Sequence, residues 1–193
     1  YMHMELVKNT VQSKLVKKIF IALIGTVILA VSSKIKIPFY PVPMTMQTFV
    51  VLLIGIGFGW KLGVATVALY LFEGIIGLPV FSGTPEKGIG FLYFTGPTMG
   101  YLLGFLVAVY VAGSFKYKDV FPDYVPEFFK NYVKLLLSVS FIYIFGLLWL
   151  GYIIGWDKPI YKIGAEPFIL AECFKILILS LLAGKINKLK KII

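Results

Sequence analysis

The sequence contains no arginine, one cysteine and one histidine, and these scarcities exclude several kinds of site. Without arginine, the bidentate contacts that its side chain makes with phosphates and guanine are unavailable. Nucleic-acid binding is therefore disfavoured, despite a net charge of +10. Cys173 alone cannot form an intrachain disulfide, and Cys173 with His3 is too few ligands for a Cys/His metal site. We expect no bound metal.

Short catalytic and nucleotide-binding motifs are also missing. The stretch GTPEKGIG at 83–90 has the glycines and lysine of a phosphate-binding loop but not its Lys-Ser/Thr ending, and neither HExxH nor GxSxG occurs. We therefore expect neither an ATP site nor a cofactor in this chain, and no enzymatic activity. An intramembrane acid–base enzyme built on Glu172 is an alternative, although no activated nucleophile accompanies that residue.

Apolar residues are abundant instead. Hydrophobic residues make up 59% of the chain and charged residues 15%, against about 45–50% and about 25% in ordinary soluble domains. Six apolar runs, each close to the roughly 20 residues that span a bilayer, lie at 18–36, 44–59, 61–79, 96–115, 133–153 and 165–184. The sequence predicts an all-α membrane protein with six transmembrane helices and a single domain over 1–193. Residues 1–3 have the appearance of an expression-vector remnant, and 4–17 form an N-terminal cytoplasmic segment.

The distribution of lysine predicts the orientation of these helices. With the N-terminus inside the cell, thirteen lysines fall on the inner side, Lys175 lies within a span, and five fall outside: Lys34, Lys36, Lys87, Lys158 and Lys162. This asymmetry favours cytoplasmic N- and C-termini and a multi-pass location in the cell membrane. The charged, aromatic segment 116–134 between the fourth and fifth runs predicts a short helix along the membrane surface.

Polar residues within the runs gather toward the outer side. Glu172 and Lys175 are spaced i, i+3 and so share one face of the last helix. Glu73 lies at a similar depth in the third run, Gln47 opens the second, and Thr98 and Tyr101 open the fourth. A charge within the bilayer costs about 2.5–3.5 kcal/mol on insertion scales. The convergence of these groups favours a ligand-binding cavity over a purely structural ion pair, which is the alternative interpretation.

Aromatic and loop residues at the same level complete the candidate site. Phe39, Phe81, Tyr93 and Tyr101 are positioned to wall a pocket, and the Gly-rich loop 80–95 is the candidate lid. On the first helix, small side chains recur at Ala22, Thr26 and Ala30. Such a stripe lets another helix approach closely, so it indicates either internal packing or a docking face for a separate protein.

Four sequence blocks resemble the BioY family, the biotin-specific membrane subunits (S components) of energy-coupling factor (ECF) vitamin transporters. They are IPFYPVPMTMQTF at 37–49, GIIGLPVFSG at 74–83, GPTMGYLLGF at 96–105 and PFILAECFK at 167–175. The resemblance spans roughly residues 20–185. It implies a six-helix subunit that captures biotin outside the cell and joins a transmembrane coupling protein and two cytoplasmic ATPases, which bind the ATP. The small-residue stripe would then face the coupling protein.

The resemblance also implies roles for individual residues. By position, Lys175 would meet the biotin carboxylate and Glu172 the ureido N–H groups. The sequence departs from the family pattern where Leu170-Ala171 replaces Pro-Gly, where Glu172 replaces Asp, and where the loop 83–90 lacks a ligand-contacting Asn. Thr84, Glu86 or Lys87 would substitute for that Asn. Another carboxylate vitamin, such as lipoate or pantothenate, and a self-sufficient secondary transporter are the alternatives.

Overall fold

The structure is a computed structural model that describes the backbone of residues 2–121 and 124–193 and the side chains of 12–121 and 125–193. Its helices are α1 (Met2–Lys34), α2 (Gln47–Ile75), α3 (Met99–Ser114), α4 (Tyr124–Ile154), α5 (Ile160–Gly164) and α6 (Ile169–Asn187). Short elements complete it: β1 (Lys36–Ile37), β2 (Met44–Thr45), η1 (Gly90–Thr95), η2 (Glu166–Phe168) and η3 (Lys188–Lys191). The expected all-helical class is confirmed. Residue 1 of the expected vector remnant lies outside the described residues.

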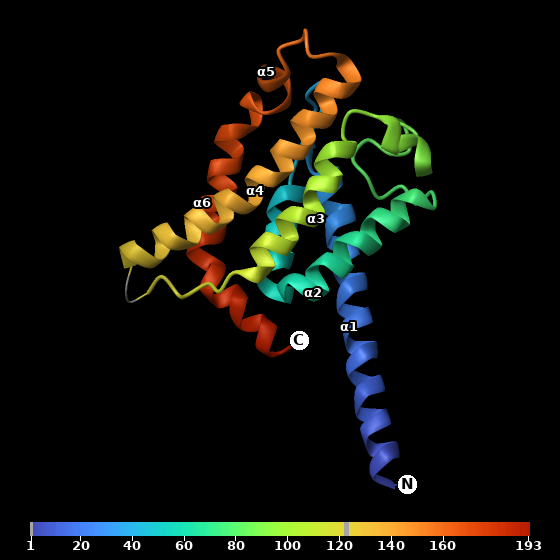
Figure 1. Cartoon of the computed structure of the whole chain (residues 1–193), viewed down its shortest axis with the longest axis vertical. Coiled ribbons are helices and arrows are strands. Elements are labelled where there is room, and N and C mark those ends of the chain that lie inside the picture. Colours follow the sequence, from blue (N-terminus) through green and yellow to red (C-terminus); the bar gives the residue numbers. More distant parts are fainter. Residues whose placement is uncertain (1, 122–123) are drawn as a thin grey trace.

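Four helical stretches of the described chain are long and apolar enough to cross a membrane: Gln12–Lys34, Gln47–Ile75, Val125–Ile154 and Ile160–Lys191. The apolar helix α3 is shorter. In Figure 1, α2, α3, α4 and α6 gather into a bundle, while the first half of α1 extends away from it. Large apolar side chains are exposed along the outside, including Val27 on α1 and Leu148 on α4, as expected where lipid is the solvent.

The second and third predicted runs, 44–59 and 61–79, both fall within α2. Gly59 has φ 77° and ψ 170° and interrupts the helix there. This backbone region is essentially restricted to glycine, so the chain reverses at the tight hairpin that the glycines of 55–63 indicate. Figure 1 shows α2 bending sharply near its middle. The break at Gly59 divides it into a first arm before this residue and a second arm after it.

The short surface helix expected within 116–134 is not present as a separate element of the described residues. Residues 116–121 are not helical, and the helical residues that follow belong to α4, which continues without a break to Ile154. Pro126 lies in the first turn of α4, where a helix tolerates proline because its missing N–H would have no partner there. No breaker separates this amphipathic start from the apolar run, so the two form one helix.

The small residues of α1 pack inside the bundle. Ala22 and Thr26 are buried and Ala30 is partly buried. Gly25 lies so close to α2 that a Cβ at this position would be 2.5 Å from Thr66 Cγ2 and 3.1 Å from Phe58. In this chain the stripe therefore serves close packing of α1 on α2, which was one of its two interpretations. Its docking role stays a prediction.

Candidate functional site

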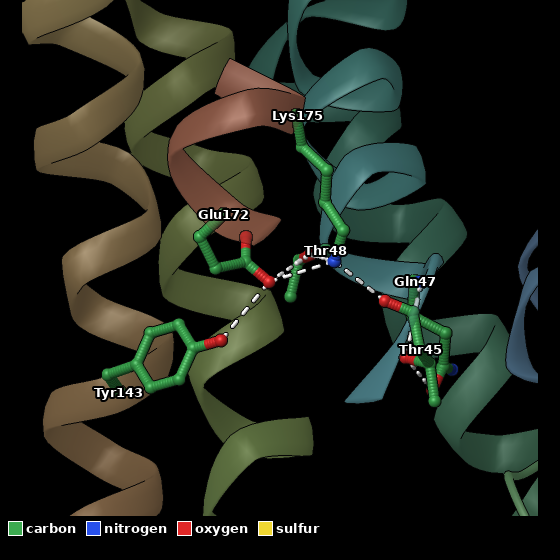
Figure 2. A network of polar contacts seen from close by, with 6 residues as sticks. All are labelled: Thr45, Gln47, Thr48, Tyr143, Glu172 and Lys175. Carbon is green, nitrogen blue, oxygen red and sulfur yellow. Dashed lines mark hydrogen bonds and ion pairs between the residues drawn. The ribbon is translucent and has the colours of Figure 1, made fainter. Parts of the chain in front are cut away.

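Glu172 and Lys175 form a buried ion pair on the first two turns of α6. Lys175 Nζ lies 2.9 Å from Glu172 Oε1, and the two side chains are 9% and 8% exposed. Lys175 also donates hydrogen bonds to Thr45 O at 2.7 Å and to Thr48 Oγ1 at 2.9 Å (Figure 2). A lysine ammonium has three N–H donors, so all three are used within the protein.

The two carboxylate oxygens of Glu172 have different surroundings. Oε1 accepts hydrogen bonds from Lys175 Nζ at 2.9 Å, from Thr48 Oγ1 at 2.9 Å and from Tyr143 OH at 3.1 Å. Oε2 is buried and has no hydrogen-bond partner. A buried carboxylate oxygen without a donor costs free energy. The arrangement therefore offers a strong acceptor to a ligand that carries N–H or O–H groups.

Three elements converge on this carboxylate because the chain before α2 is held in place. Residues 36–37 and 44–45 pair as antiparallel strands, with Lys36 opposite Thr45, and Met46 N donates to Ile35 O at 3.1 Å. Thr45 thus ends a short hairpin and Thr48 lies in the first turn of α2. Lys175 links both to α6, while Tyr143 brings in α4 (Figure 2).

A cavity of about 50 Å³ lies beside the ion pair. This is room for only a few water molecules and is much smaller than the roughly 300–1,000 Å³ of typical ligand pockets. It is lined by Val42, Pro43, Met44, Thr45, Gln47, Thr48, Ser82, Tyr93, Thr98, Tyr101, Leu102, Phe105, Ile142, Tyr143, Phe168 and Glu172. A ligand of vitamin size therefore fits only if one wall moves outward.

One wall belongs to the loop between α2 and α3. Tyr93 OH donates to Ser82 O at 2.8 Å, and its ring stacks on Phe81 at a centroid distance of 4.9 Å. Burial raises the pKa of Tyr93 above its ordinary value, so its hydroxyl stays protonated and remains a donor. Ser82 Oγ is buried and has no hydrogen-bond partner. This wall therefore places a second unsatisfied polar atom at the cavity.

The same loop is fastened to the end of α1. Lys34 Nζ donates to Phe81 O and Thr84 O, both at 2.9 Å, and to Thr84 Oγ1 at 3.0 Å. Ser33 Oγ donates to Val80 O at 2.9 Å. These bonds hold residues 80–84 against the bundle, behind the cavity wall that Ser82 contributes.

The structure brings together most, but not all, of the predicted site residues. Glu172, Gln47, Tyr93, Thr98 and Tyr101 line the cavity, and Lys175 reaches it through Thr45, Thr48 and Glu172. The other four predicted residues lie outside the lining. Phe81 and Thr84 lie behind the loop wall, Phe39 is 39% exposed and contacts Phe168 edge-on, and Glu73 is half-buried in the second arm of α2.

Sequence reasoning did not select Tyr143, Ser82 or Lys34. Tyr143 is one of many aromatics in the apolar run 133–153, and only its depth, shared with Glu172, would have singled it out. Ser82 lies within the family-like block 74–83, but a serine in a Gly-containing loop carries no signal of burial. Lys34 was interpreted only as a charged residue at the outer end of a membrane span, with no contact to the loop.

Comparisons with known proteins show the family and the fold. A profile described as the BioY family matches residues 4–191. Biotin transporter BioY of Thermotoga maritima is 33% identical over 168 residues, covering 86% of this chain and 94% of the relative. Biotin transporter BioY2 of Lactococcus lactis subsp. cremoris is 35% identical over 175 residues, covering 88% of each. A crystal structure of the S-component for biotin from an ECF-type ABC transporter shares the fold, with TM-score 0.71, 24% identity and coverage of 91% and 93%.

Proposed function

The chain belongs to the BioY family, and from this premise we propose that it captures biotin as the substrate-binding subunit of an ECF importer. Relatives over most of its length are named biotin transporters. The earlier resemblance, drawn from four short blocks, thus extends to nearly the whole chain. The family is one of transporters, which argues against an intramembrane enzyme.

The observation that carries the proposal is Glu172 Oε2, a buried carboxylate oxygen without a hydrogen-bond partner, on a residue that lines the cavity. Biotin has two ureido N–H groups, and a carboxylate oxygen accepts such donors strongly. We assign Oε2 to the ureido ring and Oε1 to the internal network. Ser82 Oγ, unpaired on the loop wall, supplies a further donor for the ureido carbonyl or the carboxylate tail.

Lys175 acts on the ligand through Glu172 in this proposal. Its three donors already have internal partners, so a direct bond to the biotin carboxylate requires the exchange of one of them. Lys175 holds the carboxylate of Glu172 in its orientation through their 2.9 Å ion pair, as a positioning residue. The family resemblance instead implies a direct contact between Lys175 and the biotin carboxylate, which stays a prediction. A double-mutant cycle and a biotin ester distinguish the two roles.

The loop wall is the part that moves to admit biotin, as the candidate lid at 80–95 predicts. The opposite wall is joined across α2, α4 and α6 by charge-assisted hydrogen bonds at Glu172. The loop is held by ring stacking and by hydrogen bonds from Lys34, Ser33 and Tyr70, and Lys34 is exposed at the end of α1. Opening the loop breaks these bonds but leaves the charge-assisted bonds at Glu172 in place.

In the membrane, we propose six crossings by α1, the two arms of α2, α3, α4 and α6. Both termini then lie in the cytoplasm and the cavity opens outward, as the lysine distribution predicts. A transmembrane coupling protein and two ATPases are the proposed partners, and these supply the ATP binding that the sequence motifs do not provide.

Equilibrium binding to the purified chain in detergent tests the proposal, with biotin, lipoate and pantothenate as ligands. We expect tight biotin binding that Glu172→Gln weakens and Glu73→Gln does not, since Glu73 is a membrane-level carboxylate away from the cavity. Preference for lipoate or pantothenate would overturn the assignment of biotin. Biotin uptake by liposomes that contain this chain alone would favour the secondary-transporter alternative.

A further inference from the structure

A second cavity, separate from the biotin site, opens between α1, the second arm of α2 and the C-terminus. It has a volume of about 590 Å³. Its apolar walls come from Leu15, Ile19 and Ala22 on α1 and from Phe58, Leu62, Ala65 and Leu69 on α2. Ile193 closes one end, and the carbonyl of Ile192 accepts a hydrogen bond from Lys17 at 2.5 Å. Figure 1 shows the C-terminus close to the bend of α2.

Three lysines from three segments line this groove: Lys18 of α1, Lys61 of α2 and Lys190 of η3. No acidic residue lines it, and neither Lys18 nor Lys61 forms an ion pair with any side chain that the structure describes. Lys190 Nζ donates to Gly113 O at 3.0 Å and to Phe115 O at 3.1 Å, and it lies 6.0 Å from the centre of the Tyr117 ring. Only its third donor has no hydrogen-bond acceptor in the protein. The groove therefore combines apolar walls with concentrated positive charge.

The lysines and the apolar positions are arranged in order along the helices. On α2, Lys61 stands next to the bend, and Leu62, Ala65 and Leu69 follow on one helix face. At 1.5 Å per residue, the wall extends about 12 Å from Lys61, most of the roughly 15 Å depth of one hydrocarbon leaflet. On α1, Ile19 and Ala22 follow Lys18 in the same way, while Leu15 lies one turn before it. A ligand with a charged head group at one end and an apolar tail at the other matches this order.

We propose that the groove binds an anionic phospholipid, with the phosphate near Lys18, Lys61 and Lys190 and one acyl chain along the apolar wall. Basic pockets between helices at the cytoplasmic surface suit anionic head groups, and the proposed orientation puts these lysines at that surface. The site rests on the proposed topology but not on the identity of the vitamin. A zwitterionic lipid would bring its own cation against the lysines, so it is disfavoured.

Native mass spectrometry of the full chain in detergent tests the proposal, with phosphatidylglycerol and phosphatidylcholine of identical acyl chains added in equal amounts. We expect selective retention of phosphatidylglycerol. Each basic side chain near an anionic head group contributes about fivefold in binding, so Lys18→Gln with Lys61→Gln should lower retention about 10- to 30-fold. Lys158→Gln with Lys162→Gln removes the same charge from exposed positions near α5 and should leave retention unchanged.

A third variant tests the apolar wall without altering charge. Ala65 is exposed in the groove, so Ala65→Trp should fill it and lower phosphatidylglycerol retention at least fivefold. Unchanged biotin binding would show that each variant is folded, since none of these residues lines the biotin cavity. Equal retention of the two lipids, or equal loss in both lysine pairs, would overturn the proposal and assign the groove to another occupant, such as a partner's helix. If the lysine variants lower phosphatidylglycerol retention and Ala65→Trp does not, the proposal is also overturned. The lysines would then bind the lipid head group while the acyl chain lies outside the groove.

Discussion

Replacing Lys175 with methionine tests how the buried ion pair supports biotin binding. Methionine keeps the long apolar stem but removes the charge and three hydrogen bonds of 2.7, 2.9 and 2.9 Å. Breaking a buried pair by removing one partner typically costs about 3–5 kcal/mol, because the other charge stays desolvated. We expect about 2–4 kcal/mol of this to appear as lost affinity, a weakening of about 30- to 700-fold. Titration calorimetry with biotin measures it.

A double-mutant cycle then separates the two roles open to Lys175. If Lys175 acts by orienting Glu172, combining Lys175→Met with Glu172→Gln costs little more than either change alone, with a coupling energy above about 1 kcal/mol. Biotin methyl ester supplies the second arm. The affinity lost when the methyl ester replaces biotin should add to the affinity lost in Lys175→Met, because the ammonium of Lys175 bonds to the protein and not to the carboxylate tail.

Three results would refute this reasoning. Affinity within twofold of the wild type in Lys175→Met would remove the pair from the binding site. Additive losses from Lys175→Met and Glu172→Gln would mean that the residues act independently. An ester that binds the variant as well as biotin does would place Lys175 on the carboxylate tail. Glu73→Gln is the matched control, because it also removes a carboxylate at membrane level but away from the cavity.

Three further changes test neighbouring features. Tyr143→Phe removes the 3.1 Å bond to Glu172 Oε1 and should cost about 1–2 kcal/mol of biotin affinity by calorimetry, since the acceptor is charged. Lys34→Met removes three of the hydrogen bonds that hold residues 80–84 and should accelerate biotin association in stopped-flow fluorescence; an unchanged rate would exclude this loop as the gate. Gly59→Ala forces a side chain into a backbone region with φ 77°, so the midpoint of thermal unfolding should fall by several degrees, at about 1–3 kcal/mol.

The membrane character and most helix positions could be predicted because they depend on local sequence. Apolar runs of bilayer length, separated by glycine, proline and lysine, identify helices without knowledge of their neighbours. The pairing of Glu172 with Lys175 is equally local, since i, i+3 spacing alone puts both side chains on one face. The structure adds the distance of 2.9 Å and the burial of both groups.

Features that depend on contacts distant in sequence were not predictable in the same way. Tyr143 meets Glu172, and Lys34 meets Thr84, only after folding. The surface helix was not confirmed as a separate element, for a different reason. Composition indicated an amphipathic segment at 116–134, but it did not indicate that residues from 125 onward continue without a breaker into the apolar part of α4.

In our proposal, Glu172 combines a structural role with a biotin-binding role within the membrane. Three donors on Oε1 satisfy one oxygen and link α2, α4 and α6, which lowers the cost of keeping a charge at this depth. Oε2 lacks a donor, so a ligand N–H gains a charge-assisted bond without displacing the network. From the sequence, a purely structural ion pair and a binding site were alternatives. We propose that the ion pair supports the binding site, because its bonds to Oε1 offset part of the cost of burying the charge.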